Sequence, residues 1–334
     1  MDFNRVVQFN FPTIIRFGAN AVKELPAYLK NNNLSKPLIV TDPVIAGLSF
    51  FKAIVADLKQ QGISAEVFSD IHKNPVKSDV IKGGDAYDTT KRDSIVGVGG
   101  GAALDVARAI VLRINHREDL FKYDDLIGGD VFVTNDVPHF ITIPTTAGTG
   151  SEVGRSAIIA DDITHQKKIL FSPKLLAKIV FADPLLTMDL PPAVTAATGM
   201  DALTHNMEAF LAKNYHPMCD GIALEGIRMI SLSLEKAVKA PDLESRAQML
   251  LASMMGAVAF QKGLGVVHSL ASPLSSLFVI HHGLANDVNI PYCMRFNNAG
   301  FEDKFVRLAQ TLELKEHTGE AVIQYLFGLN TSVG

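Results

Sequence analysis

Two different spacings of apolar residues divide the chain into two parts. In the first part, short runs of β-branched residues alternate with stretches whose apolar positions recur at helical spacing, which is typical of a parallel sheet covered by helices. Beyond Pro191 the β-branched runs give way to segments rich in Ala, Leu and Met that keep the helical spacing. We predict an α/β domain over residues 1–190 and an all-helical domain over residues 191–334, divided at the tandem prolines Pro191 and Pro192.

The same spacings predict the individual elements. We expect buried strands at residues 37–41, 65–68, 94–98, 140–143 and 178–182, and helices between them at 21–31, 48–61 and 103–114. In the second domain we expect helices at 195–211, 219–238, 243–261 and 301–311.

Composition narrows the class of protein. The chain has 334 residues, of which 48% are apolar and 20% charged, and this is the make-up of a folded globular protein rather than a disordered or fibrous one. Its net charge of −4 provides no basic field for holding nucleic acid. Two cysteines are too few for a disulfide framework, which favours a reducing compartment.

Neither a secretion signal nor a membrane span is expected. The N-terminal segment carries Arg5 and Asn10 where a signal peptide needs an unbroken apolar core. The longest apolar stretches, such as residues 251–260, are shorter than the roughly 18 residues of a membrane span. We therefore expect a cytoplasmic protein that binds neither a membrane nor nucleic acid.

A glycine-rich turn is the first candidate binding site. Gly99, Gly100 and Gly101 follow a predicted strand and open a predicted helix. Glycines allow close approach of the backbone, and the helix start offers free N–H groups, so a pyrophosphate is the expected ligand. The alternative is a tight turn without a ligand. The turn lies near residue 100 rather than in the first βα unit, which argues against an ordinary Rossmann domain.

Two further features support a nucleotide. Residues 144–152 carry hydroxyl groups and small side chains directly after a predicted strand, a composition suited to an adenine or a phosphate. The alternative for this segment is a helix entry capped by Ser151. Asp42 ends another predicted strand, where it would accept hydrogen bonds from a ribose and repel a 2′-phosphate, which favours NAD over NADP. A turn or cap aspartate before Pro43 is the other interpretation.

A group of acidic and imidazole side chains in the second domain suggests a metal ion. Asp201 and His205 are spaced i and i+4, so they share one face of a predicted helix. His268 and His282 lie on separate elements that folding must bring together. One carboxylate and three imidazoles suit Fe²⁺ or Zn²⁺. Any one of these histidines could be an ordinary core or surface residue. With His281 the second domain has four histidines near these positions, and the group favours a metal site.

Four blocks of residues carry a resemblance that spans nearly the whole chain. They are Gly99-Gly100-Gly101-x3-Asp105-x-Ala107-Arg108, the segment 145–152, Gly199-Met200-Asp201-Ala202-Leu203-Thr204-His205-x2-Glu208-Ala209, and His268-x13-His282-Gly283-x-Ala285-Asn286. Together and in this order they resemble the iron-containing, group III alcohol dehydrogenase family. The resemblance implies an α/β nucleotide-binding domain followed by an all-α domain, the fold shared with dehydroquinate synthase.

The resemblance also implies roles for individual residues. Asp42 matches the acidic position beside the adenosine ribose, the three glycines the pyrophosphate loop, and Lys167 a lysine near the cofactor ribose. Further NAD(H)-binding positions are Asp105, Thr145, Thr146 and Thr149. The ligands of the metal ion, usually Fe²⁺ and sometimes Zn²⁺, match Asp201, His205, His268 and His282.

The chain departs from the family pattern at positions near the implied reaction centre. Ser272 stands where many relatives carry a histidine, and His281 stands where proline is common before the fourth ligand. We expect these two residues to be catalytic positions, with proton release through water, His281 or the cofactor ribose. Ala102 and Arg108 replace a serine and a lysine of the glycine loop, where the backbone supplies most of the phosphate binding.

The expected function is a metal-dependent transfer of hydride between NAD(H) and a small alcohol or aldehyde, a diol or a hydroxy acid. Alternatives are a zinc polyol dehydrogenase of the glycerol type, a lyase of the dehydroquinate synthase kind, and a catalytically silent nucleotide-binding protein. Relatives commonly form homo-oligomers and run some tens of residues longer than this sequence. We therefore expect a homo-oligomer, with either a helical domain truncated at Gly334 or a complete chain whose helical domain is stabilised at a subunit interface.

Overall fold

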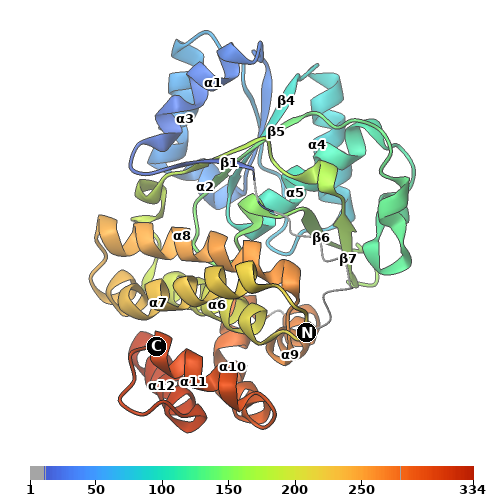
Figure 1. The fold of residues 1–334 in the computed structure, drawn as a ribbon. Helices are drawn as coiled ribbons and strands as arrows, with labels where there is room; N and C mark the ends of the chain where they lie inside the picture. The colour runs from blue at the N-terminus through green and yellow to red at the C-terminus, as the bar shows by residue number, and fades with distance from the viewer. Residues whose placement is uncertain (1–10, 12, 279) are drawn as a thin grey trace. The chain divides into compact units, whose positions relative to one another are not determined.

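A six-stranded sheet forms the centre of the first unit of the computed structural model, which describes residues 11, 13–278 and 280–334 (Figure 1). All neighbouring strands pair in parallel, in the order β1-β8-β5-β4-β2-β3. The strands are β1 Ile14–Phe17, β2 Pro37–Val40, β3 Glu66–Phe68, β4 Ser94–Gly99, β5 His139–Pro144 and β8 Ile179–Ala182. A separate antiparallel pair consists of β6 Ser156–Ala160 and β7 Lys167–Phe171.

The chain divides into two units. The sheet unit comprises Thr13–Thr146 and Ser151–Thr187, and the helical unit comprises Met188–Gly334 together with the short segment Ala147–Gly150. Helices of the sheet unit are α1 Leu25–Asn31, α2 Pro43–Gly47, α3 Ser49–Gln60, α4 Lys77–Thr89 and α5 Gly101–Asn115. Those of the helical unit are α6 Pro192–Leu211, α7 Pro217–Lys239, α8 Leu243–Ala259, α9 Val266–Leu277, α10 His282–Asn298, α11 Glu302–Thr311 and α12 Gly319–Val333.

Helices cover both faces of the sheet, which explains why its central strands are continuous apolar runs. Successive side chains of β2 point to opposite faces: Leu38 and Val40 join the core formed with α4 and α5, and Ile39 joins the core formed with α1 and α3. Figure 1 shows these two helix layers on either side of the strands. Every residue of β2 and β4 is buried as a result.

The strand order creates a switch point between β2 and β4. From β2 the chain continues to β3 on one side, and from β4 it continues to β5 on the other side. Connections that diverge in this way leave a crevice at the carboxyl ends of the two strands, where α/β proteins bind ligands. Asp42 and the glycine-rich turn follow these two strands, so the topology places both candidates at the switch point.

The long helix α6 is the centre of the helical unit. It packs against α7, α8 and α10, and nearly all its side chains from Gly199 to Leu211 are buried. A helix buried on all sides accepts polar side chains only where partners satisfy them. Its buried polar residues are therefore the natural candidates for a site.

The five predicted strands of the sheet and the helical texture beyond Pro191 are confirmed by these elements. The helix expected at 48–61 is confirmed as α3, which begins one residue later because Leu48 has extended backbone angles. The short helix α2 that precedes it was not predicted from the spacing. The helix expected at 21–31 begins with the 3₁₀ turn Ala21–Glu24 ahead of α1. Elements that the spacing did not predict are β1, β6, β7, α4, α9, α10 and α12.

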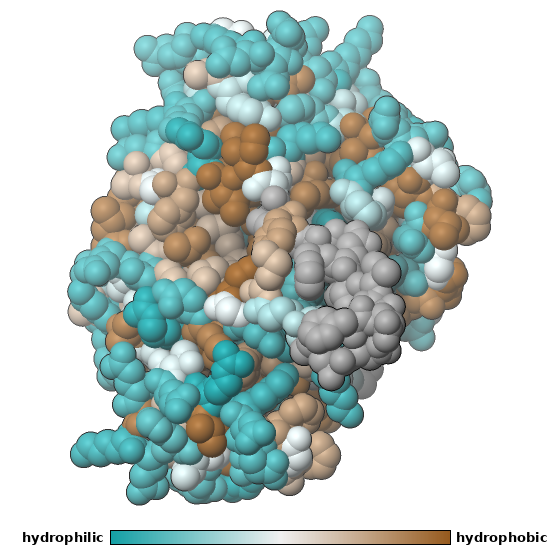
Figure 2. All heavy atoms as spheres, in the orientation of Figure 1, coloured by the Kyte–Doolittle hydropathy of each residue, from teal (hydrophilic) through white to brown (hydrophobic). Residues whose placement is uncertain are grey.

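Apolar side chains are exposed on one short segment of the sheet unit. Leu126 and Ile127 of the 3₁₀ turn η3 (Asp125–Ile127) are 70% and 72% exposed, and Val131 of η4 (Gly129–Phe132) is 66% exposed. In Figure 2, hydrophobic side chains lie at the right edge of the view, over this segment. Exposed apolar surface of this kind is typical of a contact surface.

Within the described residues no single helix is long and apolar enough to cross a membrane, and one pair bent by 109°, Leu243–Lys262 with Val266–Ser275, meets the length and composition test only when taken together.

Candidate metal centre and nucleotide-binding loops

One carboxylate on α6 lies at the centre of the candidate metal site. Asp201 and His205 are one helical turn apart and both buried, as their spacing predicts. The Oδ1 atom of Asp201 lies 3.9 Å from Nε2 of His205. The helix therefore presents two potential ligand atoms toward the same point.

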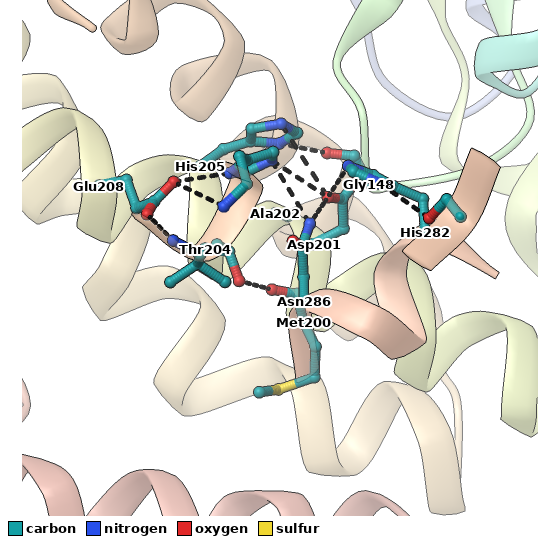
Figure 3. A network of polar contacts seen from close by, with 12 residues as sticks. Gly148, Met200, Asp201, Ala202, Thr204, His205, Glu208, His282 and Asn286 are labelled. Atoms are coloured by element: carbon teal, nitrogen blue, oxygen red, sulfur yellow. Dashed lines mark hydrogen bonds and ion pairs between the residues drawn. The ribbon is translucent and has the colours of Figure 1, made fainter. Parts of the chain in front are cut away.

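The other two histidines come from different helices. His268 lies in the first turn of α9 with its Nε2 3.7 Å from Asp201 Oδ1, and His282 begins α10 with its Nε2 3.9 Å from the same oxygen. Asp201, His205 and His268 form a cluster whose ligand atoms all lie within 4.8 Å of one another. His282 lies on the side of the cluster nearest to solvent, since its side chain is 33% exposed. Figure 3 shows this convergence.

Each of the three imidazoles is held through its other nitrogen. Nδ1 of His205 lies 3.4 Å from the carbonyl oxygen of Gly148, and Nδ1 of His282 lies 3.3 Å from Oγ of Ser275. Nδ1 of His268 lies 2.7 Å from Oε2 of Glu208. Contacts at Nδ1 direct each Nε2 toward Asp201, which is the arrangement found around histidine ligands.

The donor set and its spacing fit a first-row divalent ion. Ligand atoms about 2.1 Å from a tetrahedral ion lie about 3.4 Å apart, close to the separations between Asp201 Oδ1 and the imidazole nitrogens. Asn286 donates from Nδ2 to Asp201 Oδ1 at 2.7 Å, and its own Oδ1 is buried without a protein partner among the described residues. Three imidazoles and one carboxylate accommodate Fe²⁺ and Zn²⁺ alike.

Electrostatics hold the carboxylate in its charged form. Burial opposes ionisation of Asp201, but the neighbouring imidazoles outweigh it, and the pKa of Asp201 is lowered from its ordinary value. Burial also lowers the pKa of His205, to about 4. At His268 burial is outweighed by hydrogen bonds to Asp201 and Glu208, which raise the pKa of His268 to about 9.

A close contact between backbones brings α10 to α6 at this site. Gly283 follows His282, and a Cβ on Gly283 would lie 2.0 Å from the carbonyl oxygen of Ala197 in α6. No side chain fits in that space. The glycine therefore lets the start of α10 lie against α6, with His282 beside Asp201.

Three residues that hold the site were assigned no role from the sequence, namely Glu208, Ser275 and Asn286. Glu208 and Asn286 belong to the motifs that carry the family resemblance, but their contacts join segments distant in the chain. Glu208 follows His205 by three positions on the same buried helix face, and this spacing is a signal that could have indicated it.

The two expected catalytic positions are exposed. Ser272 lies on α9 one turn beyond His268, and His281 is the N-cap residue of α10 directly before His282. Both therefore flank a candidate metal ligand in the chain. Their catalytic roles remain predictions.

The glycine-rich turn has the backbone expected of a phosphate loop. Gly99 ends β4 with a φ of 148°, and a Cβ there would lie 2.7 Å from the Cβ of Ala103. A Cβ on Gly100 would lie 3.1 Å from Oγ1 of Thr146. Gly101 begins α5, a helix of 15 residues, so its free N–H groups point out of this turn.

Asp42 lies beside this loop. Its Oδ1 accepts hydrogen bonds from the backbone N–H groups of Val44 and Ile45 and so caps α2. This is the cap role that the sequence offered as the alternative to ribose binding. Its Oδ2 points to the neighbouring strand end, 3.7 Å from where a Cβ of Gly99 would be. One carboxylate oxygen is therefore used as a cap, and the other lies beside the glycine at the end of β4.

The threonines of the second segment predicted to bind a nucleotide follow β5. The backbone N–H of Thr145 donates to the carbonyl oxygen of Gly99 at 3.0 Å, which ties this segment to the glycine turn, and Oγ1 of Thr145 is buried without a protein partner among the described residues. The side chain of Thr146 lies next to the space that a Cβ on Gly100 would occupy. Thr149 falls in the segment Ala147–Gly150, which belongs to the helical unit.

Asp105 is occupied by contacts inside the protein. Its Oδ1 accepts from Oγ of Ser151 at 2.8 Å and from Arg108, and its Oδ2 accepts from the backbone N–H of Ile158 at 3.1 Å. The Arg108 side chain is fully buried. Burial lowers the pKa of Lys167, which begins β7 in the electrostatic field of Asp105. These contacts hold α5 to β6, and the expected cofactor roles of Asp105 and Lys167 remain predictions.

A buried glutamate in the same region predicts a pH-dependent cost to stability. Burial raises the pKa of Glu152 from 4.5 to about 7. The folded protein therefore binds more protons than the unfolded chain between these two values, so stability falls as pH rises through this window and the full cost persists above it. A shift of this size corresponds to about 3 kcal/mol.

We expect the neutral variant Glu152→Gln to gain stability relative to the wild type as pH rises. Urea unfolding of both proteins at pH 5 and pH 8 measures this, and the difference in unfolding free energy should change by about 3 kcal/mol in favour of the variant. The exposed variant Glu66→Gln should show no such change. Parallel pH profiles for Glu152→Gln and wild type would contradict the assignment.

Comparisons with known proteins agree with this geometry. A family model described as "Iron-containing alcohol dehydrogenase" matches residues 12–184, and one described as "Fe-containing alcohol dehydrogenase family, C-terminal" matches residues 195–334. The curated relatives include the 4-hydroxybutyrate dehydrogenase of Cupriavidus necator, which is 38% identical over 96% of this chain and 86% of its own length.

Solved structures show the same fold. A 1,3-propanediol oxidoreductase is similar with a TM-score of 0.93 and 31% identity, over 99% of this chain and 87% of its own. The sulfoacetaldehyde reductase from Bifidobacterium kashiwanohense in complex with NAD+ has a TM-score of 0.89 and 25% identity, over 99% of this chain and 86% of its own. The predicted fold class and the predicted resemblance are thereby confirmed.

Proposed function

Because the chain belongs to the iron-containing alcohol dehydrogenase family, an oxidoreductase family with NAD-dependent members, we propose that it transfers a hydride between NAD(H) and a short primary alcohol or the matching aldehyde. The proposed metal ligands are Asp201, His205, His268 and His282. The observation that carries the proposal is the buried Oδ1 of Asp201, which faces three imidazole nitrogens at 3.7–3.9 Å.

The protein's own groups prepare this chemistry. When bound, the metal ion polarises the oxygen of the substrate while the nicotinamide ring exchanges the hydride. Asp201 supplies the negative charge that offsets the cation, and the Nδ1 contacts of the three histidines fix the direction of their Nε2 atoms. The partial exposure of His282 leaves the substrate a route to the open side of the site.

Proton release is proposed to involve the exposed positions near the ligands. His281 precedes His282 at the start of α10 and is exposed, so its imidazole is placed to pass a proton between the site and solvent. Ser272 has a hydroxyl group but no group that titrates near neutral pH. We therefore assign proton exchange to His281 or to water, and a hydrogen-bonding role to Ser272.

The cofactor is proposed to be NAD rather than NADP. Support comes from Asp42, whose Oδ2 lies beside Gly99 at the switch point of the sheet. A carboxylate there accepts hydrogen bonds from ribose hydroxyls and repels a 2′-phosphate. The glycine turn and the threonines after β5 are proposed to hold the pyrophosphate and the adenine side of the cofactor.

The substrate is proposed to carry a second polar group at the far end of a short carbon chain. The names of the three relatives support this, since 4-hydroxybutyrate, 1,3-propanediol and sulfoacetaldehyde each combine a terminal alcohol or aldehyde with another polar group. A hydroxy acid and a diol were both among the substrate classes expected from the sequence.

The proposal is tested by following NADH absorbance with purified protein loaded with Fe²⁺ or Zn²⁺. We expect turnover of 4-hydroxybutyrate or 1,3-propanediol, a weaker reaction with ethanol, and little reaction when NADP replaces NAD. Metal content is measured beside each assay. Absence of turnover across a broad alcohol and aldehyde panel, in protein shown to contain one ion per chain, would contradict the proposed function.

We also propose a cytoplasmic homo-oligomer that binds neither nucleic acid nor a membrane. The exposed apolar side chains of η3 and η4 support an interface between copies of the chain. Analytical ultracentrifugation measures the oligomeric state directly.

A further inference from the structure

A buried carboxylate lies behind the candidate metal centre on the same helix. Glu208 follows Asp201 by seven positions and His205 by three, so α6 presents all three side chains toward α9. Glu208 is 1% exposed. A charge removed from water to this extent requires strong partners, because an unpaired buried carboxylate is very costly.

The partners of Glu208 come from the first turn of α9. Its Oε2 accepts from Nδ1 of His268 at 2.7 Å and faces the backbone N–H of His268 at 3.4 Å, and its Oε1 accepts from the backbone N–H of Val267 at 2.6 Å. The N-cap residue Gly265 has no side chain that could satisfy these N–H groups. Glu208 therefore caps α9 from a different helix and binds an imidazole in that same turn.

The backbone of α9 leaves room for this carboxylate. A Cβ on Gly265 would lie 2.7 Å from Oε1 of Glu208, closer than nonbonded atoms approach. The glycine thus permits the carboxylate to reach the N–H group of Val267. Any side chain at this position would have to displace Glu208 or the helix start.

The contact determines what His268 offers to a metal ion. A carboxylate that accepts from Nδ1 fixes the proton there, so the lone pair of the neutral imidazole is on Nε2, and Nε2 lies 3.7 Å from Asp201 Oδ1. The Nδ1 atoms of His205 and His282 have longer contacts with uncharged partners, 3.4 Å to Gly148 and 3.3 Å to Ser275. The Nδ1 contact of His268 is therefore shorter than these two and is made to a charged group, Glu208, which is labelled in Figure 3.

We propose that Glu208 is a positioning residue of the metal centre: by capping α9 and binding Nδ1 of His268 with one carboxylate, it sets the tautomer and direction of this ligand and thereby the affinity for the ion. This inference rests on the proposed function, because it requires Asp201 and the histidines to bind a metal. The role is indirect, since Glu208 reaches the ion only through His268.

The test measures metal affinity rather than turnover. Glu208→Gln keeps the shape of the side chain but removes its charge, and we expect its dissociation constant for Zn²⁺ to rise about 10- to 100-fold in a competition titration with a chromophoric chelator. Because a glutamine amide offers one accepting oxygen where the carboxylate offers two, and carries no charge, it holds His268 less firmly. The visible absorption bands of the Co²⁺-loaded variant should therefore also change in position or intensity. The exposed variant Glu244→Gln, with the same change of charge, should match the wild type in both.

A second variant separates positioning from folding. Gly265→Ala leaves Glu208 in the chain but puts a Cβ where Oε1 lies, so it should weaken Zn²⁺ binding and alter the Co²⁺ spectrum in the same direction. The thermal unfolding midpoint of each metal-free variant shows whether it is folded at the titration temperature. A purely structural role would lower this midpoint and leave the Zn²⁺ affinity and Co²⁺ spectrum of the folded protein unchanged.

The outcomes distinguish this inference from the proposed function. If the wild type binds no metal, the proposed function fails. If the wild type binds one ion per chain, and folded Glu208→Gln and Gly265→Ala bind Zn²⁺ as tightly with an unchanged Co²⁺ spectrum, the inference about Glu208 is overturned while the proposed function stands. Should Glu208→Gln fail to fold, Gly265→Ala alone decides in the same way.

Discussion

Replacing Asp201 by asparagine is expected to abolish metal binding and NAD-linked turnover. The side chain keeps its size, and its oxygen can still accept the hydrogen bond from Asn286. What disappears is the negative charge that faces three imidazoles at 3.7–3.9 Å. An ion whose direct ligands are all neutral has no negative charge in contact with it, so much of the compensation for its desolvation is lost.

The expected loss for Asp201→Asn exceeds the roughly 10- to 100-fold drop in affinity that follows from removing a partner of a ligand. We expect turnover to fall about 10³-fold or more, because polarisation of the substrate depends on the ion. Elemental analysis after gel filtration gives the metal content, and NADH absorbance gives the rate. Asp303→Asn, an exposed aspartate in the first turn of α11, is the matched control. A variant with full metal content would refute the assignment of Asp201.

The central strands of the sheet could be predicted because helices cover both of their faces. β2 and β4 are buried along their whole length and appear in the sequence as continuous apolar runs. β1 could not be predicted in this way, because it lies at the sheet edge and most of its side chains are exposed. Its position depends on backbone pairing with β8, which leaves no pattern in the side chains.

Other helices were not predicted because packing against neighbouring helices stabilises them, while glycine or proline interrupts the helical pattern in their sequence. α4 contains Gly83 and Gly84, which weaken a helical pattern, yet a Cβ on Gly83 would lie 2.2 Å from the side chain of Ile110 in α5. α9 and α10 each contain a proline, Pro273 and Pro291, which indicates a helix end in sequence. Close approach of helices is a tertiary property, so local spacing does not predict it.

In the candidate site, too, local spacing could be predicted from the sequence and tertiary contacts could not. The pair Asp201 and His205 could be predicted because the ligands are one helical turn apart. The partners of Glu208 and Asn286 could not be predicted, since they are 60 and 85 positions away in the chain. The family resemblance predicted all four ligands. The hydrogen bonds that orient the histidines are seen only in the folded structure.

Replacing Gly99 by valine is expected to remove most of the affinity for NAD. The φ of 148° at this position is rare for residues with a side chain, and a Cβ would lie 2.7 Å from that of Ala103 in α5. The loop can relieve this strain only by moving its backbone away from the conformation that presents N–H groups at the start of α5. Binding of the pyrophosphate would then have to restore the strained conformation. Strain of about 1–3 kcal/mol, together with the clash, predicts a rise in dissociation constant of about 100-fold or more.

Isothermal titration with NAD measures this loss, and Gly62→Val is its matched control. Gly62 also has a positive φ, 79°, but it lies in the turn after α3, where a Cβ would meet nothing within 4 Å, so valine there adds strain away from the switch point. The control should lose stability and keep its affinity for NAD, and both variants should keep the metal content of the wild type because the metal ligands lie in the helical unit. Equal NAD affinity in Gly99→Val and Gly62→Val would show that the cofactor does not bind at the glycine turn, since only the first substitution changes the backbone at the carboxyl end of β4.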